Sequence, residues 1–319
     1  MIQTIAPQID SGISLRSRKL SMYKQIDSNK RKTFLFITIF LIFIIGLGWI
    51  LSYAFDAYWI LPIAVIIAVF QALSSYFWSD KIALSISGAH PAPRKKYIEL
   101  HRIVENLSIT SGLPQPDIYV IDDPAPNAFA TGRDPKHSSI AVTSGLLEKL
   151  EKSELEGVIA HEMSHVKNYD IRLMTVVVVL VGVIALVSDF FLRWSFFGGG
   201  FRRRDSNSGQ LGAILMLVGI ILAITSPIIA YLIQLAISRK REYLADASGA
   251  LLTRYPEGLA SALEKISQDP HQLRKASNAT SHLFIANPFK GKAKKFSSLF
   301  MTHPPIDDRI EKLREMIGR

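Results

Sequence analysis

The sequence of 319 residues contains no cysteine. This absence excludes disulfide bonds, cysteine nucleophiles and thiolate metal ligands, so a metal site in this chain must be built from histidine, aspartate or glutamate. Residues 1–32 lack the apolar core and the small-residue cleavage site of a secretory signal peptide, which predicts that no cleavable signal is present. Acidic residues are fewer than basic ones, 27 against 37, which gives a formal net charge of +10.

Apolar residues, in contrast, are abundant. They make up 49% of the chain and its mean hydropathy is positive, which is more apolar than an ordinary soluble protein of this size. We therefore expect membrane spans beside a sizeable polar domain. The excess of basic residues could indicate nucleic acid, but these residues cluster beside the apolar runs, as juxtamembrane charge does. The expected partner is a lipid bilayer, and no nucleic acid.

Two uncharged runs of the N-terminal part, 33–55 and 57–79, are separated by Asp56 alone. Each is long enough to cross a hydrocarbon core of about 30 Å, so 33–79 is predicted to be a transmembrane hairpin. Seven lysines and arginines between Arg16 and Lys32 favour a cytoplasmic N-terminus and a chain that returns to the cytoplasm. We expect residues 1–32 to form a short basic tail that is disordered in part.

Two further apolar runs lie within residues 173–236 and predict a second hairpin. All four tryptophans fall at the ends of apolar runs, which supports four spans. Arg193 and the arginines at 202–204 oppose this topology, because a crossing hairpin would place them outside. The two runs could cross the membrane or dip into it from one face. In both cases residues 80–172 and 237–319 can meet as two parts of one catalytic domain.

A possible metal site lies at His161-Glu162-Met163-Ser164-His165, in a segment with helical periodicity. Residues four apart in a helix share a face, roughly 5–6 Å apart at Cβ, so both histidines can bind one zinc ion. Glu162 would then lie beside the metal, placed to take a proton from the attacking water. Ser153 and Glu156 are expected to form the capping box of this helix. Its apolar face is predicted to contain Leu155, Val158, Ile159 and Val166.

Two simpler explanations compete with this interpretation. The string could have arisen by chance on a surface helix, or it could belong to a closed structural zinc site, although such sites favour thiolates. A catalytic site needs a third protein ligand, for which Glu242 is the candidate. Asp246, four residues later on the same helical face, would accept the free N–H of a ligating imidazole. The alternative is a charged turn at a membrane exit, with Glu242 paired to a neighbouring arginine.

Other segments of the polar parts predict a small β-sheet and further site residues. Residues 117–121 and 139–143 have the composition of short strands, and 123–133 is expected to be the loop between them. An exposed strand here could pair with an extended peptide, or the segment could be an ordinary connection. His303 precedes a helix whose inner face is predicted to hold Ile306, Ile310, Leu313 and Ile317. This histidine could be a surface residue, stabilise the oxyanion, or occupy the open position of the metal.

Three motifs together resemble the HtpX heat-shock family of membrane zinc metalloproteases, relatives of the CAAX prenyl endoproteases: HEMSHVKNYD at 161–170, REYLAD at 241–246 and THPPIDDRI at 302–310. PNAFATGRD at 126–134 and the two N-terminal spans extend the resemblance over roughly residues 30–319. It implies an α+β fold, namely a multi-pass α-helical membrane protein with a mainly helical, gluzincin-type zinc metalloprotease domain and a small β-sheet.

The resemblance also implies roles for individual residues. His161, His165 and Glu242 match the ligands of one zinc ion per subunit, and Glu162 matches the general base. Further candidate residues are His303 for catalysis, Asp170 and Asp246 for support of the metal ligands, and Asn127, Ala128 and Phe129 for substrate binding.

The function expected from these features is a zinc endopeptidase of the cell membrane, with its active site facing the cytoplasm. Its substrates would be unfolded or misfolded membrane proteins, hydrolysed as part of a stress response. Three alternatives are an intramembrane zinc protease, a catalytically idle zinc-binding scaffold or chaperone, and a prenyl-protein processing enzyme. The charged flanks of the His161–His165 motif argue against the first, and four spans are few for the last.

Overall fold

The computed structural model describes residues 15–54, 56–180, 182–183, 239–275, 280, 282–288 and 304–317. Residues 1–14 of the predicted tail, most of the second apolar hairpin and His303 lie outside the described residues. The described helices are α1 (Leu15–Ala54), α2 (Ile60–Phe77), α3 (Ser79–Ser87), α4 (Ile98–Ser111), α5 (Ser144–Lys149), α6 (Lys152–Lys167), α9 (Arg239–Thr253), α10 (Pro256–Gln268) and α11 (Ile306–Glu315).

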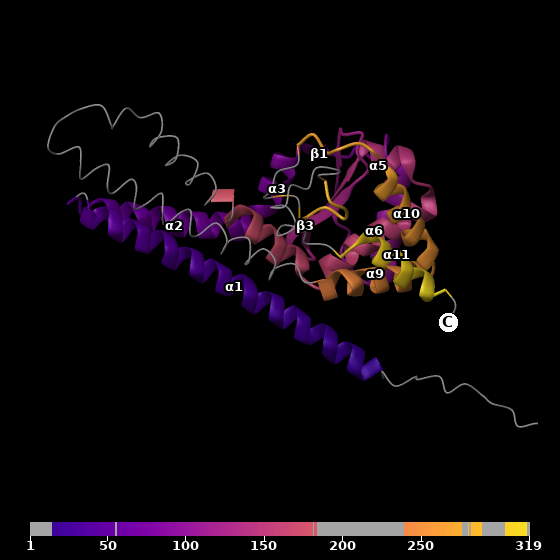
Figure 1. Ribbon diagram of the computed structural model, residues 1–319, viewed down its shortest axis with the longest axis horizontal. Helices are drawn as coiled ribbons and strands as arrows, with labels where there is room; N and C mark the ends of the chain where they lie inside the picture. The colour runs from indigo at the N-terminus through magenta and orange to yellow at the C-terminus, as the bar shows by residue number, and fades with distance from the viewer. Residues whose placement is uncertain are drawn as a thin grey trace, which may run out of the picture.

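Helix α2 and the C-terminal part of α1 lie side by side and project away from the polar domain (Figure 1), whereas Asn29 in the N-terminal part of α1 contacts Asp170 of that domain. By length and composition, Ile26–Tyr53 and Ile60–Phe77 could each cross a membrane. Helix α1 begins at Leu15, so the predicted basic tail is helical from this residue onward. Residues 15–32 contain no proline or glycine, and seven of them are lysine or arginine, which are good helix formers, so the helix can continue through them.

Several large apolar side chains on α1 and α2 are exposed in the isolated chain. They include Phe34, Ile42, Trp49, Ile66 and Phe70. Large exposed apolar patches mark sites of contact with other proteins or with a membrane. Insertion into lipid would remove this surface from water. The two helices therefore have the surface expected of membrane spans.

A mixed sheet of four strands lies beside the helices, in the order β1-β2-β4-β3. The strands are β1 (Ala89–Pro91), β2 (Asp117–Ile121), β3 (Ala128–Asp134) and β4 (His137–Thr143). Strands β2 and β4 are parallel, with Asp117 opposite Ser139 and Ile121 opposite Thr143. The two predicted strands are thus confirmed. Strand β3 pairs antiparallel with β4 and lies at the edge of the sheet.

The predicted loop at 123–133 is wrong in its second half, which forms most of β3. The turn-forming prolines and Asn127 precede the strand, and Gly132 occupies a bulge within it. At Gly132 the φ angle is +140°, and an added Cβ would lie 2.2 Å from the carbonyl oxygen of His137. Only glycine fits this approach of the two strands, so the residue that suggested a loop is instead a requirement of the hairpin.

The central helix of the polar domain is α6, which packs against β3, α9 and α10. Its four predicted apolar residues are all buried. The predicted capping box is wrong by two residues: Glu151 is the N-cap, and Glu154 bonds back to its amide at 2.8 Å. Glu154 also accepts hydrogen bonds from Ser261 and Lys265 of α10, which fixes it at this position.

The predicted inner face of α11 is correct only in part. Leu313 is buried, and Ile306 and Ile310 are half-buried against the core. Ile317 is exposed, because the helix has already ended at Glu315. On the same face, between Ile306 and Leu313, lies the fully buried side chain of Arg309.

Candidate metal centre

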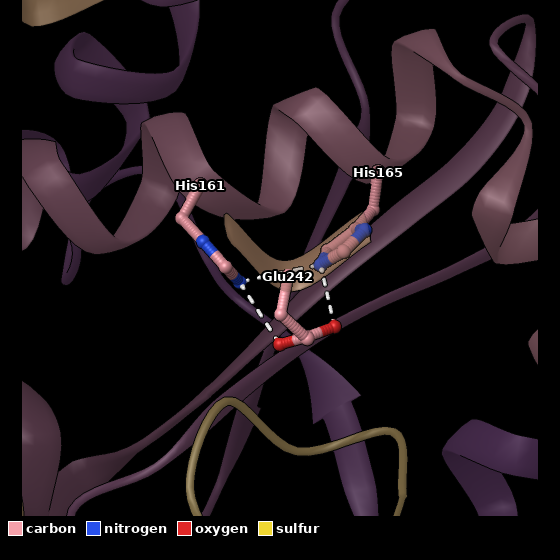
Figure 2. A group of neighbouring side chains, drawn as sticks. All are labelled: His161, His165 and Glu242. Atoms are coloured by element: carbon pink, nitrogen blue, oxygen red, sulfur yellow. Dashed lines mark hydrogen bonds and ion pairs between the residues drawn. The ribbon is translucent and has the colours of Figure 1, made fainter. Parts of the chain in front are cut away.

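Three buried side chains from α6 and α9 converge on one point. His161 and His165 are one turn apart on α6, and Glu242 faces them from the first turn of α9 (Figure 2). The two helices lie very close together, since an added Cβ on Gly249 of α9 would be 2.9 Å from the amide nitrogen of His161. The predicted grouping of these three residues is therefore present in the structure.

The distances within this group are short. The two histidine Nε2 atoms are 3.2 Å apart. Glu242 Oε2 lies 3.9 Å from His161 Nε2, and Glu242 Oε1 lies 3.6 Å from His165 Nε2. One ligand atom from each residue lies within 4.8 Å of the other two. Ligands at about 2.0–2.1 Å from a tetrahedral zinc ion would be roughly 3.3 Å apart, so the group has the size of such a site.

A carboxylate orients each imidazole from the opposite side. Nδ1 of His161 is 2.9 Å from Asp246 Oδ1, and Nδ1 of His165 is 3.1 Å from Asp170 Oδ2. A carboxylate beside Nδ1 accepts a hydrogen bond from the N–H at that position. The ring proton is then on Nδ1, and the lone pair of Nε2 is directed at the centre of the group. Asp170 and Asp246 thus occupy the positions predicted for residues that support the metal ligands.

The electrostatics of the cluster also suit a cation. Electron pairs from two imidazoles and one carboxylate point toward each other and repel. A cation bound between them would remove this repulsion. The buried carboxylates of Glu162, Asp170, Glu242 and Asp246 face two buried guanidinium groups, those of Arg241 and Arg309. With the carboxylates ionised and both imidazoles neutral, as zinc binding requires, the excess of two negative charges would be balanced by a divalent ion. The residues therefore fit the bound zinc that the sequence predicts.

The two histidines differ in their electrostatic surroundings. Burial lowers the pKa of His161, although Asp246 opposes this shift. Burial would also lower the pKa of His165, but its hydrogen bond to Asp170 and the charge of Glu242 raise it to about 9. Zinc binding requires both imidazoles in the neutral form, so a proton on His165 would compete with the metal.

Glu162 lies next to this group and is not one of its three converging residues. Its side chain is buried, and burial raises its pKa to about 7, with the charge of Glu242 acting in the same direction. The carboxylate accepts a hydrogen bond from the backbone amide of Ala130 in β3. A carboxyl group with a pKa near neutrality can both take up and release a proton at physiological pH.

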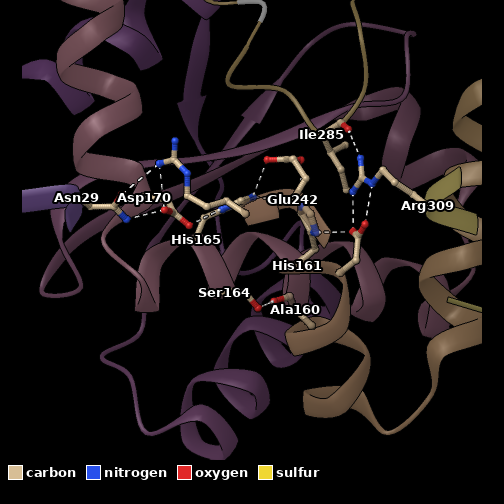
Figure 3. Close-up of polar contacts among 11 residues, drawn as sticks. Asn29, Ala160, His161, Ser164, His165, Asp170, Glu242, Ile285 and Arg309 are labelled. Carbon is tan, nitrogen blue, oxygen red and sulfur yellow. Dashed lines mark hydrogen bonds and ion pairs between the residues drawn. The ribbon is translucent and has the colours of Figure 1, made fainter. Parts of the chain in front are cut away.

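Arg309 was not predicted to be a site residue from the sequence. Its guanidinium donates two hydrogen bonds to Asp246, at 2.8 and 2.7 Å, and a third to the carbonyl of Ile285 at 2.9 Å (Figure 3). Although burial opposes ionisation of Asp246, the Arg309 charge lowers the pKa of that carboxyl to about 2. A signal was present in the sequence, because Arg309 interrupts the apolar face of α11.

A second group was also missed, on the other side of His165. Asn29 of α1 donates to Asp170 Oδ1 at 2.7 Å, and Arg241 of α9 lies 3.4 Å from the same oxygen. Both side chains are buried. No local pattern could have found Asn29, which lies in a polar, basic stretch far from the motif.

The three predicted substrate-binding residues are buried, with Ala128 and Phe129 at the start of β3 and Asn127 immediately before it. The carbonyl of Ala128 accepts a hydrogen bond from the amide of Ile285 at 2.9 Å, and the Asn127 side chain donates to the carbonyl of Ala286 at 3.0 Å. The ring of Phe129 packs edge-to-face against Phe284. Residues 284–286 therefore cover the outer edge of β3 at this end, and contact of substrate with the three residues stays a prediction.

Comparison with known proteins gives consistent matches. Residues 94–317 match the family model for peptidase family M48. A "Protease HtpX homolog" of Caldanaerobacter subterraneus subsp. tengcongensis is 49% identical, over 93% of this chain and 99% of the relative. The homologue of Thermoanaerobacter pseudethanolicus is 48% identical over 94% of this chain and 99% of the relative. That of Streptococcus uberis is 41% identical over 92% of this chain and 100% of the relative.

A solved structure is also similar. The crystal structure of S. mikatae Ste24p matches with a TM-score of 0.48 and 22% sequence identity, and the match covers 88% of this chain and 65% of that one.

Proposed function

The chain belongs to peptidase family M48, together with its HtpX homologues, and is a metalloprotease; we propose that it is a zinc-dependent endopeptidase of the cell membrane. One zinc ion per chain is held by His161, His165 and Glu242. The observation that carries this proposal is the convergence of these three buried ligands, each imidazole held by its own carboxylate. A zinc ion at this position would polarise the scissile carbonyl and lower the pKa of water.

The residues of the chain supply the proton transfers. Glu162, with its pKa raised to about 7, takes a proton from the attacking water and passes it to the departing amine. The hydrogen bond from Ala130 keeps the carboxylate in place beside β3. Asp170 and Asp246 hold the N–H of each imidazole at Nδ1, so that Nε2 stays available as a ligand. His303 is proposed as a further catalytic residue on the strength of the sequence motif alone.

We further propose that α1 and α2 span the membrane, that residues 173–236 form a second membrane hairpin, and that 80–172 and 237–319 form the catalytic domain on the cytoplasmic side. The apolar exposed surfaces of α1 and α2 and the basic residues that precede the span support this topology. The packing of α6 among β3, α9 and α10 supports a site within the polar domain rather than inside an apolar span.

The sidedness can be tested directly, since the chain has no native cysteine. Tyr58 is 82% exposed in the connection between α1 and α2, and Lys95 is exposed in the polar domain. In intact cells, a membrane-impermeant thiol reagent should label Tyr58→Cys, whereas Lys95→Cys should react only after lysis. Labelling of Lys95→Cys in intact cells would contradict the cytoplasmic orientation.

The proposed substrates are unfolded cytoplasmic segments of damaged or misfolded membrane proteins. Edge strand β3 supports this choice, because a peptide in extended conformation can pair with the outer edge of a sheet once the groups that cover this edge are displaced. Near Ala128 that edge is now paired with Ile285, so a peptide bound there would take the place of residues 284–286. A folded protein offers few segments that can extend in this way.

This substrate class predicts a large difference between two forms of one protein. Detergent-purified enzyme should hydrolyse reduced, alkylated α-lactalbumin, and should hydrolyse the native, disulfide-bonded form at least about 100-fold more slowly, because only a rare opened form could reach the site. Fragment formation measured by mass spectrometry gives both rates. Equal rates on the two forms would contradict a requirement for an extended segment. The absence of hydrolysis of any unfolded protein would contradict the proposed activity itself.

A further inference from the structure

Asn29 connects the first membrane helix to the candidate metal centre. It lies on α1 within the candidate span Ile26–Tyr53, and its side chain is 3% exposed. Its amide nitrogen donates to Asp170 Oδ1 at 2.7 Å and to the carbonyl of Asn168 at 3.0 Å. Its amide oxygen lies 3.3 Å from a donating nitrogen of Arg241. Both amide hydrogens and the oxygen of this buried side chain are therefore used.

These contacts continue to a metal ligand. The two oxygens of Asp170 have different partners: Oδ2 faces Nδ1 of His165 at 3.1 Å, and Oδ1 accepts from Asn29 (Figure 3). Arg241, which contacts the same Oδ1 at 3.4 Å, is adjacent in sequence to Glu242. A continuous set of hydrogen bonds thus leads from α1 through Asp170 to His165.

The orientation of Asp170 depends on these bonds. A carboxylate that orients a ligating imidazole must itself be held, and loss of such an outer contact commonly lowers metal affinity by about 10- to 100-fold. The contact on Oδ1 comes mainly from Asn29, because its 2.7 Å bond is shorter than the 3.4 Å contact from Arg241. Helix α1 therefore forms one wall of the support around His165, besides being long and apolar enough to span a membrane.

We propose that Asn29 is a positioning residue for the metal centre: through Asp170 it fixes the orientation of His165 and makes metal affinity depend on the seating of α1 against the catalytic domain. The inference rests on the proposed function, because it assumes that the cluster of His161, His165 and Glu242 binds zinc. A catalytic domain separated from α1 would then lose metal affinity as well as its anchor.

The test compares zinc affinities of the full-length, metal-free protein in one detergent, measured by competition with a chromophoric chelator. Asn29→Leu is expected to weaken zinc binding by about 10-fold or more. Thr33→Val is the matched control. Thr33 lies one turn further on α1 and is equally buried, and its hydroxyl bonds to the Asn29 carbonyl within the same helix. This control should bind zinc within about twofold of the wild type.

A second comparison separates positioning from a general loss of packing. In an Asp170→Asn background, Asn29→Leu should weaken zinc binding little further, because the residue through which it acts is already changed. Equal zinc affinity of Asn29→Leu and the wild type, or an equal loss in both backgrounds, would overturn the inference. If Asn29→Leu does not fold, Asn29→Ala provides the same comparison, with a smaller loss of about threefold expected. Wild-type protein that binds no zinc would instead contradict the proposed function.

Discussion

Replacing Glu162 with glutamine is expected to lower the rate of peptide hydrolysis by a factor of about 10² to 10⁴ while the protein still binds zinc. Glutamine has nearly the same shape as glutamate, but its amide cannot accept the proton of the attacking water. Glu162 is not one of the three converging ligands, and its burial and raised pKa suit it to proton transfer rather than to metal binding. This variant should therefore lose most of its hydrolysis and keep its zinc content.

The measurement is the initial rate of cleavage of an unfolded protein, together with the zinc content of the same preparation. Glu156→Gln is the matched control, since Glu156 is on the same helix and only partly buried. It should cleave at the wild-type rate. If Glu162→Gln retained wild-type hydrolysis, another group would have to act as the base. If it lost its zinc, the assignment of Glu162 to proton transfer alone would be wrong.

Replacing Arg309 with methionine is expected to destabilise the protein by about 3–5 kcal/mol, because it leaves the Asp246 carboxylate buried without its guanidinium partner. Both side chains are buried, and two hydrogen bonds of 2.7 and 2.8 Å join them. The carbonyl of Ile285 also loses its donor. Since Asp246 holds His161, weaker zinc binding should accompany the loss of stability.

Unfolding midpoints of the metal-free variants in one detergent measure this effect. Arg314→Met is the matched control on the same helix, because Arg314 pairs with Glu257 and Glu264 at the surface, and its midpoint should change little. A second change, Asp246→Asn, should recover part of the stability lost in Arg309→Met by removing the uncompensated charge. A midpoint for Arg309→Met equal to that of the control would show that the buried pair is not required.

The parts of the site that could be predicted are those encoded within one helix. His161, Glu162 and His165 follow from residue spacing alone, because a helix fixes their relative positions. Glu242 required a further step, since α9 is distant in sequence, but the need for a third ligand and the REYLAD motif limited the choice. Strands β2 and β4 were likewise predictable from short runs of strand-forming residues.

The missed residues depend on contacts between distant segments. Asn29 contacts Asp170, 141 residues away, and Arg309 contacts Asp246 at a separation of 63 residues. No local spacing encodes either pair. Arg309 was marked only by its place on an apolar helix face, and Asn29 by nothing at all. Strand β3 was missed for another reason, because its glycine and the prolines before it have the composition of a loop.

A single zinc ion at this site should be required for hydrolysis. The most direct measurement follows cleavage of an unfolded protein as zinc is added to metal-free enzyme of known concentration. Hydrolysis should be absent at the start, rise in proportion to the zinc added, and stop rising at one zinc ion per chain. Full hydrolysis without metal, or a rise that persists when Glu242 is replaced by alanine, would contradict the account.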